Sequence, residues 1–388
     1  MRFLVSGGGT GGHVYPVLAV VDALQNAAAM SSPAPSVEDG SQSPSGLEIR
    51  YAGTADGIEA KLAPQAGLDF VAIQAGQVRI RNPFKLVRSG VKLLYGGWQA
   101  RSLMRRWRPD AVFVTGGYAC APVVWAAHRQ RVPILIYLPD MTPGLAVERL
   151  SRYADQIAVS FPEVARFFPD QAIVTGYPVR SELRKRSSNK TDARTQFDLA
   201  PEQPTILIFG GSRGARSINI ATANILPQLL EIAQVIHITG TLDWSLSQER
   251  AIDLTAEQRN RYRPYSYLHE EIIAAFNAAD LVIARAGAAT LGEFPALGLP
   301  AILVPLPISG GHQQPNADYL AERGAAIVIA DADMPERLWP ALHDLLTHPE
   351  KLAAMSQASA SLAQPDAADC IASALVALAA QRTKQQNE

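Results

Sequence analysis

The order of apolar and polar positions along the chain predicts short buried strands that alternate with helices. Runs such as 111–114 and 134–137 contain no charged residue, which is typical of parallel strands buried on both faces. After the predicted strand 2–5, Val17, Val20 and Leu24 recur at helical spacing. This alternation predicts an α/β protein with parallel sheets. The expected strands are residues 2–5, 47–52, 111–114, 134–137, 156–160, 172–174, 205–209, 234–239, 280–284 and 300–305.

Two glycine-rich turns follow predicted strands and open predicted helices. Residues 7–13 read Gly-Gly-Gly-Thr-Gly-Gly-His, and residues 210–216 read Gly-Gly-Ser-Arg-Gly-Ala-Arg. The first turn of a helix has unpaired N–H groups and a partial positive charge, and glycine lets an anion approach the backbone closely. Both turns are therefore candidate phosphate sites, and Ser212 would add a hydroxyl donor. A turn of this kind is also an ordinary corner of an α/β protein, so each one alone leaves that alternative open.

The repetition of this device predicts two doubly wound domains, each with a ligand site at the C-terminal end of its first strand. A cleft between the two domains would be the natural site. A chain of 388 residues is long enough for both. The Gly and Pro of residues 175–180 and the polar run 187–194 predict the linker. The expected domains are residues 1–178 and 179–365.

Three other segments carry local expectations. Residues 30–46 are rich in Ala, Ser, Pro and Gly without an apolar period, which predicts a disordered surface insertion. Thr54 precedes a helical pattern and is a candidate N-cap. Residues 243–263 are expected to form a polar stretch before a helix over 270–277.

Composition narrows the classes of function. Hydrophobic residues make up 48% of the chain, and the formal net charge of −1 gives no global attraction to nucleic acid. Cys120 and Cys370 lack metal-ligand spacing, which argues against a zinc site or a disulfide framework. The first strand leads directly into the glycine turn without the apolar region of a signal peptide, and no apolar run approaches the roughly 20 residues of a spanning helix. We expect a cytoplasmic protein whose contact with a membrane is peripheral.

Residues 70–109 contain no Asp or Glu and are rich in basic and apolar side chains. Such a segment attracts anionic lipid headgroups and offers apolar groups to the bilayer interface, so an anionic membrane surface is a candidate partner. The alternative is a solvated helix face with its apolar side in the core. No nucleic acid is expected, because no binding motif accompanies the charge. The segment includes Arg79, Arg81, Lys85, Arg88, Lys92, Arg101, Arg105, Arg106 and Arg108, with Val78, Ile80, Phe84 and Trp98 among them.

The chemically densest passage follows the predicted strand 280–284. Small residues and a hydroxyl group come first, in residues 285–290, and Glu293 lies one turn into the next helix. A carboxylate near a phosphate site can accept hydrogen bonds from both ribose hydroxyls of a nucleotide. The alternative is that Glu293 only complements its helix N-terminus. The strand 300–305 then leads to a second polar loop, residues 309–316.

Together these motifs resemble the MurG family, the UDP-N-acetylglucosamine transferases of bacterial peptidoglycan synthesis within glycosyltransferase family 28. The resemblance runs nearly end to end. It implies the GT-B fold, in which two Rossmann-like domains face each other across a cleft. It places the lipid acceptor on the N-terminal domain, the nucleotide sugar on the C-terminal domain, and a final helix, residues 366–388, back on the N-terminal domain. The motifs are residues 8–13, 116–118, 178–180, 210–216, 285–293 and 313–316.

The resemblance implies an inverting transfer of N-acetylglucosamine from UDP-N-acetylglucosamine to the 4-hydroxyl of the N-acetylmuramoyl unit of undecaprenyl-pyrophosphoryl-MurNAc-pentapeptide, without a cofactor. His13 is the candidate general base, because histidine exchanges protons near neutral pH. The alternative for His13 is a hydrogen bond to a phosphate or a cap of the turn. No Asp-x-Asp lies at an expected strand end, so no metal is expected.

The resemblance also implies a set of substrate-binding residues, in which Arg180 and Ser212 would take charge on the leaving diphosphate. The chain departs from the family at one point, because Tyr-Leu-Pro-Asp, ending at Asp140, stands where the family usually has His-Glu-Gln-Asn. The implied set is Thr10, Gly11, Gly12, Asp140, Arg180, Ser212, His269, Ala288, Ala289, Thr290, Glu293, Gln313 and Gln314.

Three other functions remain open from the sequence. Asp140 keeps open a related GT-B transferase that acts on another lipid or small-molecule acceptor. The first glycine turn resembles a dinucleotide fingerprint, but Gly-Thr-Ala at residues 53–55 stands where a nicotinamide-dependent oxidoreductase needs an acidic residue. A non-catalytic subunit that binds a nucleotide sugar is the third alternative, and the presence of His13 argues against it.

Overall fold

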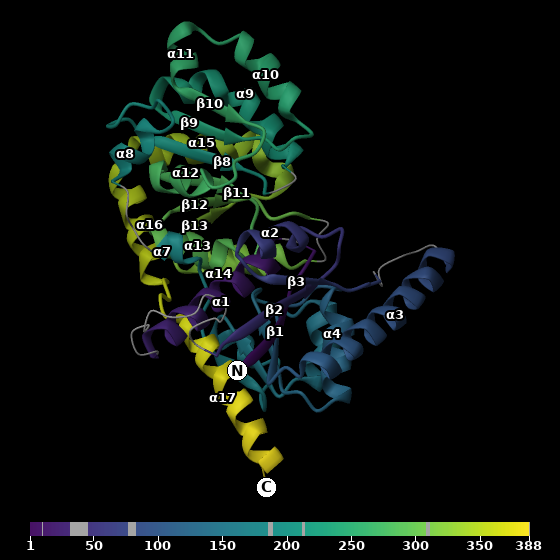
Figure 1. The fold of residues 1–388 in the computed structure, drawn as a ribbon. Coiled ribbons are helices and arrows are strands. Elements are labelled where there is room, and N and C mark those ends of the chain that lie inside the picture. The colour runs from purple at the N-terminus through teal and green to yellow at the C-terminus, as the bar shows by residue number, and fades with distance from the viewer. Residues whose placement is uncertain are drawn as a thin grey trace, which may run out of the picture. The chain divides into compact units, whose positions relative to one another are not determined.

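The computed structural model describes residues 1–9, 11–31, 46–76, 83–184, 189–211, 214–307 and 311–387. These residues divide into two compact units. The first is Met1–Ser181 with Pro365–Glu388, and the second is Glu182–Gln364. Each unit contains a parallel β-sheet that is covered by helices (Figure 1). The predicted fold class, α/β with two doubly wound domains, is confirmed.

In the first unit the strands run in the order β3-β2-β1-β4-β5-β6-β7, and their pairings are parallel. Val5 of β1 lies opposite Tyr51 on one side and Phe113 on the other. The order along the chain therefore reverses between β1 and β4. The strands are β1 (Arg2–Ser6), β2 (Glu48–Gly53), β3 (Asp69–Ala72), β4 (Ala111–Val114), β5 (Ile134–Leu138), β6 (Gln156–Val159) and β7 (Ala172–Val174).

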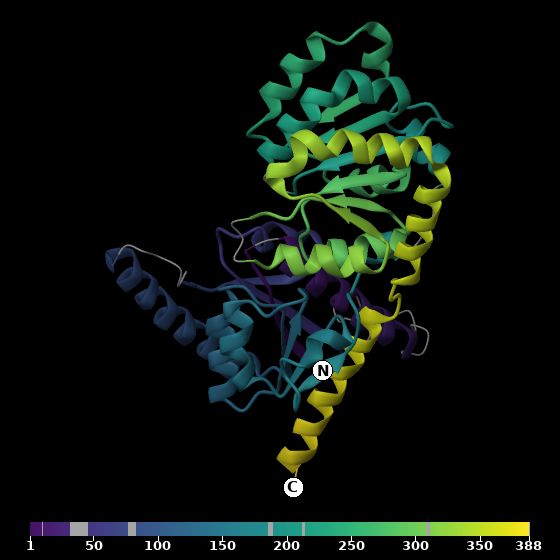
Figure 2. The ribbon, with the colours of Figure 1, turned by 180° about the vertical axis from the view of Figure 1, so that it is seen from behind.

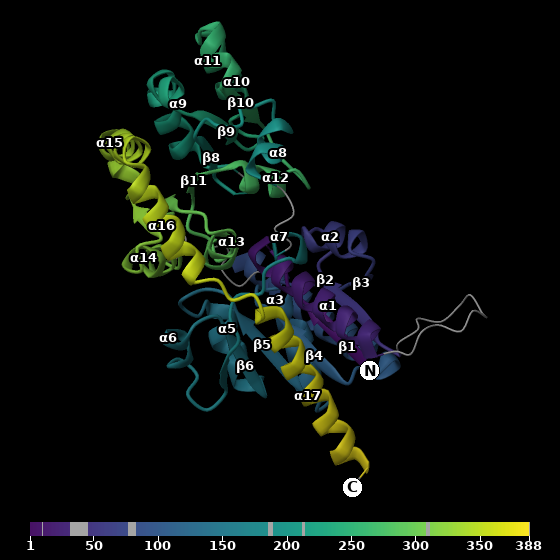
Figure 3. The ribbon, with the colours of Figure 1, turned by 90° about the vertical axis from the view of Figure 1, so that its left-hand side faces the viewer.

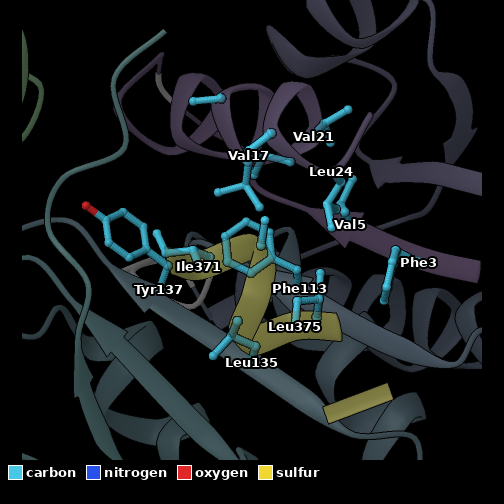
Figure 4. Packing of buried hydrophobic residues seen from close by; sticks show 14 of the residues in the cluster. Phe3, Val5, Val17, Val21, Leu24, Phe113, Leu135, Tyr137, Ile371 and Leu375 are labelled. Carbon is cyan, nitrogen blue, oxygen red and sulfur yellow. The ribbon is translucent and has the colours of Figure 1, made fainter. Parts of the chain in front are cut away.

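Helices α1 and α17 of the first unit lie side by side although they come from opposite ends of the chain (Figure 3). Ile371 and Leu375 of α17 join Val17 of α1 and Phe113 of β4 in one apolar core (Figure 4). Helix α3 packs along α4 and extends beyond the sheet (Figure 2). The helices are α1 (Gly11–Ser31), α2 (Glu59–Gln65), α3 (Pro83–Trp107), α4 (Cys120–Arg129), α5 (Leu145–Leu150), η1 (Ser151–Tyr153), α6 (Pro162–Ala165) and α17 (Ala367–Asn387).

In the second unit the strands run in the order β10-β9-β8-β11-β12-β13, again in parallel, and the order reverses between β8 and β11. Apolar residues of α9 and α15 form a core with this sheet. The strands are β8 (Thr205–Phe209), β9 (Gln234–Ile238), β10 (Tyr262–Tyr265), β11 (Leu281–Ala284), β12 (Ala301–Leu303) and β13 (Ala326–Val328). The helices are α7 (Ser181–Arg184), α8 (Lys190–Thr195), α9 (Arg216–Ile232), α10 (Trp244–Ile252), α11 (Ala256–Asn260), α12 (Ile272–Ala278), α13 (Thr290–Leu297), α14 (Gln313–Glu322), η2 (Asp331–Asp333), α15 (Met334–Thr347) and α16 (Pro349–Ser361).

The sequence did not predict β3, β10 and β13, which lie at the edges of the two sheets. Strand β10, which reads Tyr-Arg-Pro-Tyr, is only partly buried and carries no continuous apolar run. Strand β13, which reads Ala-Ile-Val, does carry such a run and was nevertheless missed. The polar stretch 243–263 contains α10, α11 and the start of β10, none of which the sequence analysis predicted.

Two local expectations are also corrected. Helix α1 continues to Ser31, so Met30 and Ser31 are helical, and residues 32–45 of the expected insertion lie outside the described residues. Thr54 is no N-cap, because α2 begins only at Glu59. The Thr54 hydroxyl instead donates to Glu59 Oε1 (2.7 Å).

The polar run expected as part of the linker belongs partly to the second unit. Helix α8 lies within it, and the Arg194 side chain is only 6% exposed. Its guanidinium pairs with Asp280 (Nη2 to Oδ2, 2.5 Å) and donates to the carbonyl of Ala278 (3.1 Å). Asp280 also accepts from the backbone N–H of Thr205 (2.8 Å), at the start of β8. Polar residues here serve a buried ion pair that ties α8 to the sheet.

We predict that Arg194→Gln lowers the free energy of unfolding by about 3 kcal/mol, because it leaves the Asp280 carboxylate without its buried partner. Lys190→Gln is the matched control, since Lys190 pairs with the same carboxylate (2.7 Å) from an exposed position. Its expected cost is below about 1 kcal/mol. Urea denaturation measures both, and equal costs would contradict a structural role for the buried pair.

Candidate functional site

In each unit the predicted glycine turn follows the strand at which the sheet order reverses. The turn of residues 7–9 follows β1, next to β4, and the turn that begins at Gly210 follows β8, next to β11. At such a point the chain leaves neighbouring strands in opposite directions and opens a crevice beyond their C-terminal ends. Open α/β sheets bind ligands there. The two turns are described below as separate sites.

The turn of the first unit passes very close to the turn that follows β4. A Cβ atom at Gly117, which has φ +82°, would lie 2.4 Å from the carbonyl oxygen of Gly8. Only glycine fits this approach. Gly11 and Gly12 open α1, so their N–H groups belong to the unpaired first turn of a long helix. Thr10 lies outside the described residues.

His13 lies in the first turn of α1 and is half-buried. Its Nδ1 is 2.9 Å from the carbonyl oxygen of Thr115, the residue that follows β4. Thr115 Oγ1 donates in return to the carbonyl of His13 (2.5 Å). The predicted base is therefore held from the neighbouring strand. The sequence analysis did not single out Thr115, although its place between a buried strand and two glycines was a usable signal.

A buried carboxylate, which the sequence analysis also missed, lies beneath the same turn. Glu59 is fully buried, and its Oε1 accepts from both the backbone N–H (3.1 Å) and the hydroxyl (2.7 Å) of Thr54. A Cβ atom at Gly8 would lie 2.6 Å from this oxygen. The carboxylate thus supports the backbone of the turn.

Asp140 and Arg180 also lie in the first unit. Asp140 is half-buried just beyond the end of β5. The pKa of Tyr137 lies well above its usual range, mainly because the side chain is buried. The hydrogen bond to Ser160 lowers this pKa, and the negative charge of Asp140 raises it. The guanidinium carbon of Arg180 lies 4.3 Å from the ring centre of Tyr15, a residue of α1, in a cation–π contact.

The turn of the second unit is held by the same kind of backbone approach. A Cβ atom at Gly214, which has φ +76°, would lie 2.3 Å from the carbonyl oxygen of Thr239. Helix α9 begins at Arg216, so its unpaired N–H groups face the turn. Ser212 lies outside the described residues.

A buried polar network braces this turn from below. Asn219 of α9 donates to the carbonyl of Thr239 (2.8 Å) and to Asp243 (3.0 Å), and its Oδ1 lies 3.1 Å from His237 Nε2. Arg216 donates to the same Asp243 (3.1 Å). Burial lowers the pKa of His237 to about 3, so this ring is neutral near pH 7 and its Nε2–H donates to Asn219. No pattern along the chain predicts this network, because its members come from separate elements.

The passage after β11 forms a compact turn into α13. Thr290 Oγ1 donates to the carbonyl of Gly287 (2.7 Å), Ala288 is buried, and Ala289 is the N-cap residue. Glu293 lies in the first turn of α13 and is 9% exposed.

The guanidinium of Arg285, at the end of β11, is bonded to residues of neighbouring elements. It pairs with Asp331 and donates to Ser217 Oγ (2.7 Å) and to the carbonyl of Val304 (3.1 Å). These contacts join α9, the end of β12 and η2 around the turn.

The remaining predicted residues follow other strands of the same sheet. Gln313 Oε1 accepts from the backbone N–H of Leu306 (2.8 Å), and Gln314 donates to Asp318 (2.8 Å). The buried Asn316 donates to the carbonyl of Ala286 (3.1 Å) and so ties α14 to the turn after β11. His269 is exposed between β10 and α12, with its ring 4.7 Å from that of Tyr267.

No group of three or more His, Cys, Asp or Glu side chains among the described residues is placed to hold a metal ion. No described helix is long and apolar enough to cross a membrane.

Two doubly wound sheets, each with a glycine turn at its switch point, are the architecture of the GT-B glycosyltransferases. Sequence comparison agrees: the Glycosyltransferase family 28 N-terminal domain matches residues 44–159, and the Glycosyltransferase family 28 C-terminal domain matches residues 205–371. The chain belongs to glycosyltransferase family 28 and, within it, to the MurG family, as its motifs predicted.

Similar proteins match over nearly their whole length. A relative from Roseiflexus sp. (strain RS-1) is 40% identical over 98% of this chain and 96% of its own, and one from Desulforudis audaxviator (strain MP104C) is 39% identical over 99% and 100%. Both are named UDP-N-acetylglucosamine--N-acetylmuramyl-(pentapeptide) pyrophosphoryl-undecaprenol N-acetylglucosamine transferase. The crystal structure of Acinetobacter baumannii MurG superposes with a TM-score of 0.69 at 27% identity, covering 97% of this chain and 99% of that one.

Proposed function

We propose that this protein is an inverting glycosyltransferase of peptidoglycan synthesis. It transfers N-acetylglucosamine from UDP-N-acetylglucosamine to the 4-hydroxyl of the N-acetylmuramoyl unit of undecaprenyl-pyrophosphoryl-MurNAc-pentapeptide. The observation that carries the proposal is the glycine turn at each switch point, in a chain that is 40% identical over nearly its whole length to a transferase of that name.

In this proposal the second unit binds the donor. The N–H groups at the start of α9, with Ser212, take the diphosphate, and Glu293 accepts the ribose hydroxyls. The low exposure of Glu293 supports this role, because a carboxylate at a helix N-terminus needs no burial if it only complements the helix. Arg180 adds positive charge to the leaving diphosphate. His269, Ala288, Ala289, Thr290, Gln313 and Gln314 complete the donor site.

The first unit binds the lipid-linked acceptor near its own glycine turn, with Thr10, Gly11, Gly12 and Asp140. His13 removes the proton from the 4-hydroxyl as that oxygen forms a bond to C1 of the donor sugar. The bond between C1 and the UDP oxygen breaks in the same displacement, which inverts C1. Backbone N–H donors stabilise the charge that develops on the diphosphate.

The donor site gives the first prediction of this proposal. Glu293→Ala should weaken UDP binding by about 1–3 kcal/mol, because it removes the acceptor of the ribose hydroxyls. Glu322→Ala is the control, since it removes a largely exposed carboxylate at the end of α14. Isothermal calorimetry measures both. Unchanged binding by the Glu293 variant would show that the nucleotide site is misplaced.

A transfer assay tests the activity itself. Purified protein with labelled UDP-N-acetylglucosamine and the undecaprenyl-linked acceptor should give the disaccharide lipid, and His13→Ala should lower turnover about 100-fold or more with UDP affinity nearly unchanged. A panel of other UDP-sugars and acceptors runs in parallel because of Asp140. Preferential transfer to another acceptor would replace the proposed function with that of a related transferase.

A surface on α3 supports a membrane partner for the first unit. Five apolar side chains, each between 52% and 76% exposed, recur at helical spacing along it, while Ala100, Met104 and Trp107 on the opposite side are buried. Exposed Arg88, Arg105 and Arg106 flank this stripe. Apolar groups framed by basic groups suit an anionic bilayer surface, and we place the enzyme at the cytoplasmic face of the cell membrane. The stripe is Val87, Val91, Leu94, Tyr95 and Trp98.

The structure does not describe every residue that the sequence analysis assigned to this surface. Val78, Arg79, Ile80 and Arg81 lie outside the described residues, and the side chains of Phe84 and Lys85 are not described. The proposal therefore rests on residues 87–106.

We predict that Leu94→Gln with Trp98→Gln lowers binding to anionic vesicles at least about tenfold, because each buried apolar side chain contributes roughly 1.5–3 kcal/mol. The control pair is Leu242→Gln with Ile252→Gln, two side chains of the second unit that are 75% and 73% exposed. Vesicle co-sedimentation measures both pairs, and wild-type binding should weaken as salt rises. Equal binding by both variants would show that this side of α3 is an ordinary solvated helix face.

A further inference from the structure

The structure places a second residue in the proton-transfer step. We infer that Thr115 is a positioning residue that fixes the imidazole of His13 with its proton on Nδ1, so that Nε2 is the nitrogen that accepts the proton of the attacking hydroxyl. This inference rests on the proposed function, because it concerns the base of that reaction. It assigns to a specific neighbour what the resemblance leaves open, namely which ring nitrogen acts and what aims it.

Thr115 holds His13 at two points. Its carbonyl oxygen lies 2.9 Å from Nδ1, and its hydroxyl donates to the main-chain carbonyl of His13 (2.5 Å). One contact sets the rotation of the ring, and the other sets the backbone from which the ring projects. The two residues are separated by 102 positions in the sequence, so the sheet alone brings them together.

The position of Thr115 is itself fixed by the sheet. Its side chain is fully buried, and its N–H donates to the carbonyl of Ser6 (3.1 Å), which extends the parallel pairing of β1 and β4. Gly7 makes room for the contact, because a Cβ atom there would lie 2.3 Å from Thr115 Oγ1 and 2.6 Å from the carbonyl oxygen of His13. Gly7 is therefore required for the hydrogen bond between the Thr115 hydroxyl and the His13 carbonyl as well as for the turn.

The chemistry of the carbonyl settles the tautomer. A carbonyl oxygen only accepts hydrogen bonds, so Nδ1 must carry the proton in this contact. A neutral imidazole has one N–H, which leaves the lone pair on Nε2. The backbone carbonyl thus takes the place that a carboxylate has in other histidine bases, where the orienting group also stabilises the charged ring.

The reaction step balances with this assignment. The hydroxyl proton moves to Nε2, the hydroxyl oxygen forms its bond to C1, and the electron pair of the breaking C1–O bond leaves with UDP. The imidazolium that results still donates through Nδ1 to Thr115. The proton on Nε2 then passes to water, which restores the starting tautomer.

The test separates the ring geometry from the transfer activity. Thr115→Val keeps the branched shape but removes the hydroxyl donor, and Thr115→Ser keeps the donor. ¹⁵N NMR of histidine-labelled protein reports the tautomer, with the His13 signals assigned from their loss in His13→Gln. We expect the Nδ1–H tautomer in the wild type and in both variants, because each keeps the backbone carbonyl that accepts from Nδ1. The Val variant loses only the hydroxyl bond to the His13 backbone, and with it the aim of Nε2.

Kinetics complete the test. The Val variant should lose at least about tenfold in kcat, part of the roughly 10²–10⁴-fold that a general base contributes, with KM for UDP-N-acetylglucosamine unchanged. The Ser variant should recover most of that loss. Thr175→Val is the matched control, because Thr175 likewise follows a strand of the same sheet and precedes a glycine, with hydroxyl contacts of 3.4 Å to backbone carbonyls.

Three results would overturn the inference. They are an Nε2–H tautomer in the wild type, a Val variant with wild-type kcat, and an equal loss of kcat in Thr175→Val. A failure of the proposed function looks different. In that case the tautomers behave as expected but the wild type transfers no sugar to any acceptor, and the contact between Thr115 and His13 is then only structural.

Discussion

Both candidate sites depend on backbone segments that come too close together to admit a side chain. In each unit the turn after one strand packs directly on the turn after a neighbouring strand. Gly117, after β4, lies on Gly8, after β1, in the first unit, and Gly214, after β8, lies on Thr239, after β9, in the second. The close approach brings two strand ends to one point. It also aims the first turn of a long helix, α1 or α9, at the crevice.

The sequence was informative where a structural requirement leaves a local pattern. Strands buried on both faces need continuous apolar runs, so β4, β5 and β8 could be predicted almost to the residue. Glycines required by positive φ or by a close approach of neighbouring groups stand together in the sequence, so both turns were found. Edge strands such as β10, which reads Tyr-Arg-Pro-Tyr, need no such run and were missed.

The sequence was uninformative where the requirement is met by residues that are distant along the chain. Arg194, Glu59 and His237 look like ordinary polar positions, yet each is buried and bonded to residues from other elements. A polar residue is buried only if the fold supplies its partners, and no single-sequence pattern shows which partners it will meet. The same holds for Thr115, whose contact with His13 exists only because β1 and β4 are neighbours. The proposed base, His13, could be named from its motif, but not the residue that holds it.

Helix α17 has a consequence for how the protein is made. Its buried residues, Ile371 and Leu375 among them, fill part of the core of the first unit, and the members of that core outside α17 come from residues 3–158. A ribosome synthesises those early residues first, and domains commonly fold in that order. Here the core of the N-terminal unit must remain without α17 until the second unit has been synthesised. The second unit can therefore complete its fold first, and the nascent N-terminal unit exposes apolar surface for that interval, when it depends most on chaperones.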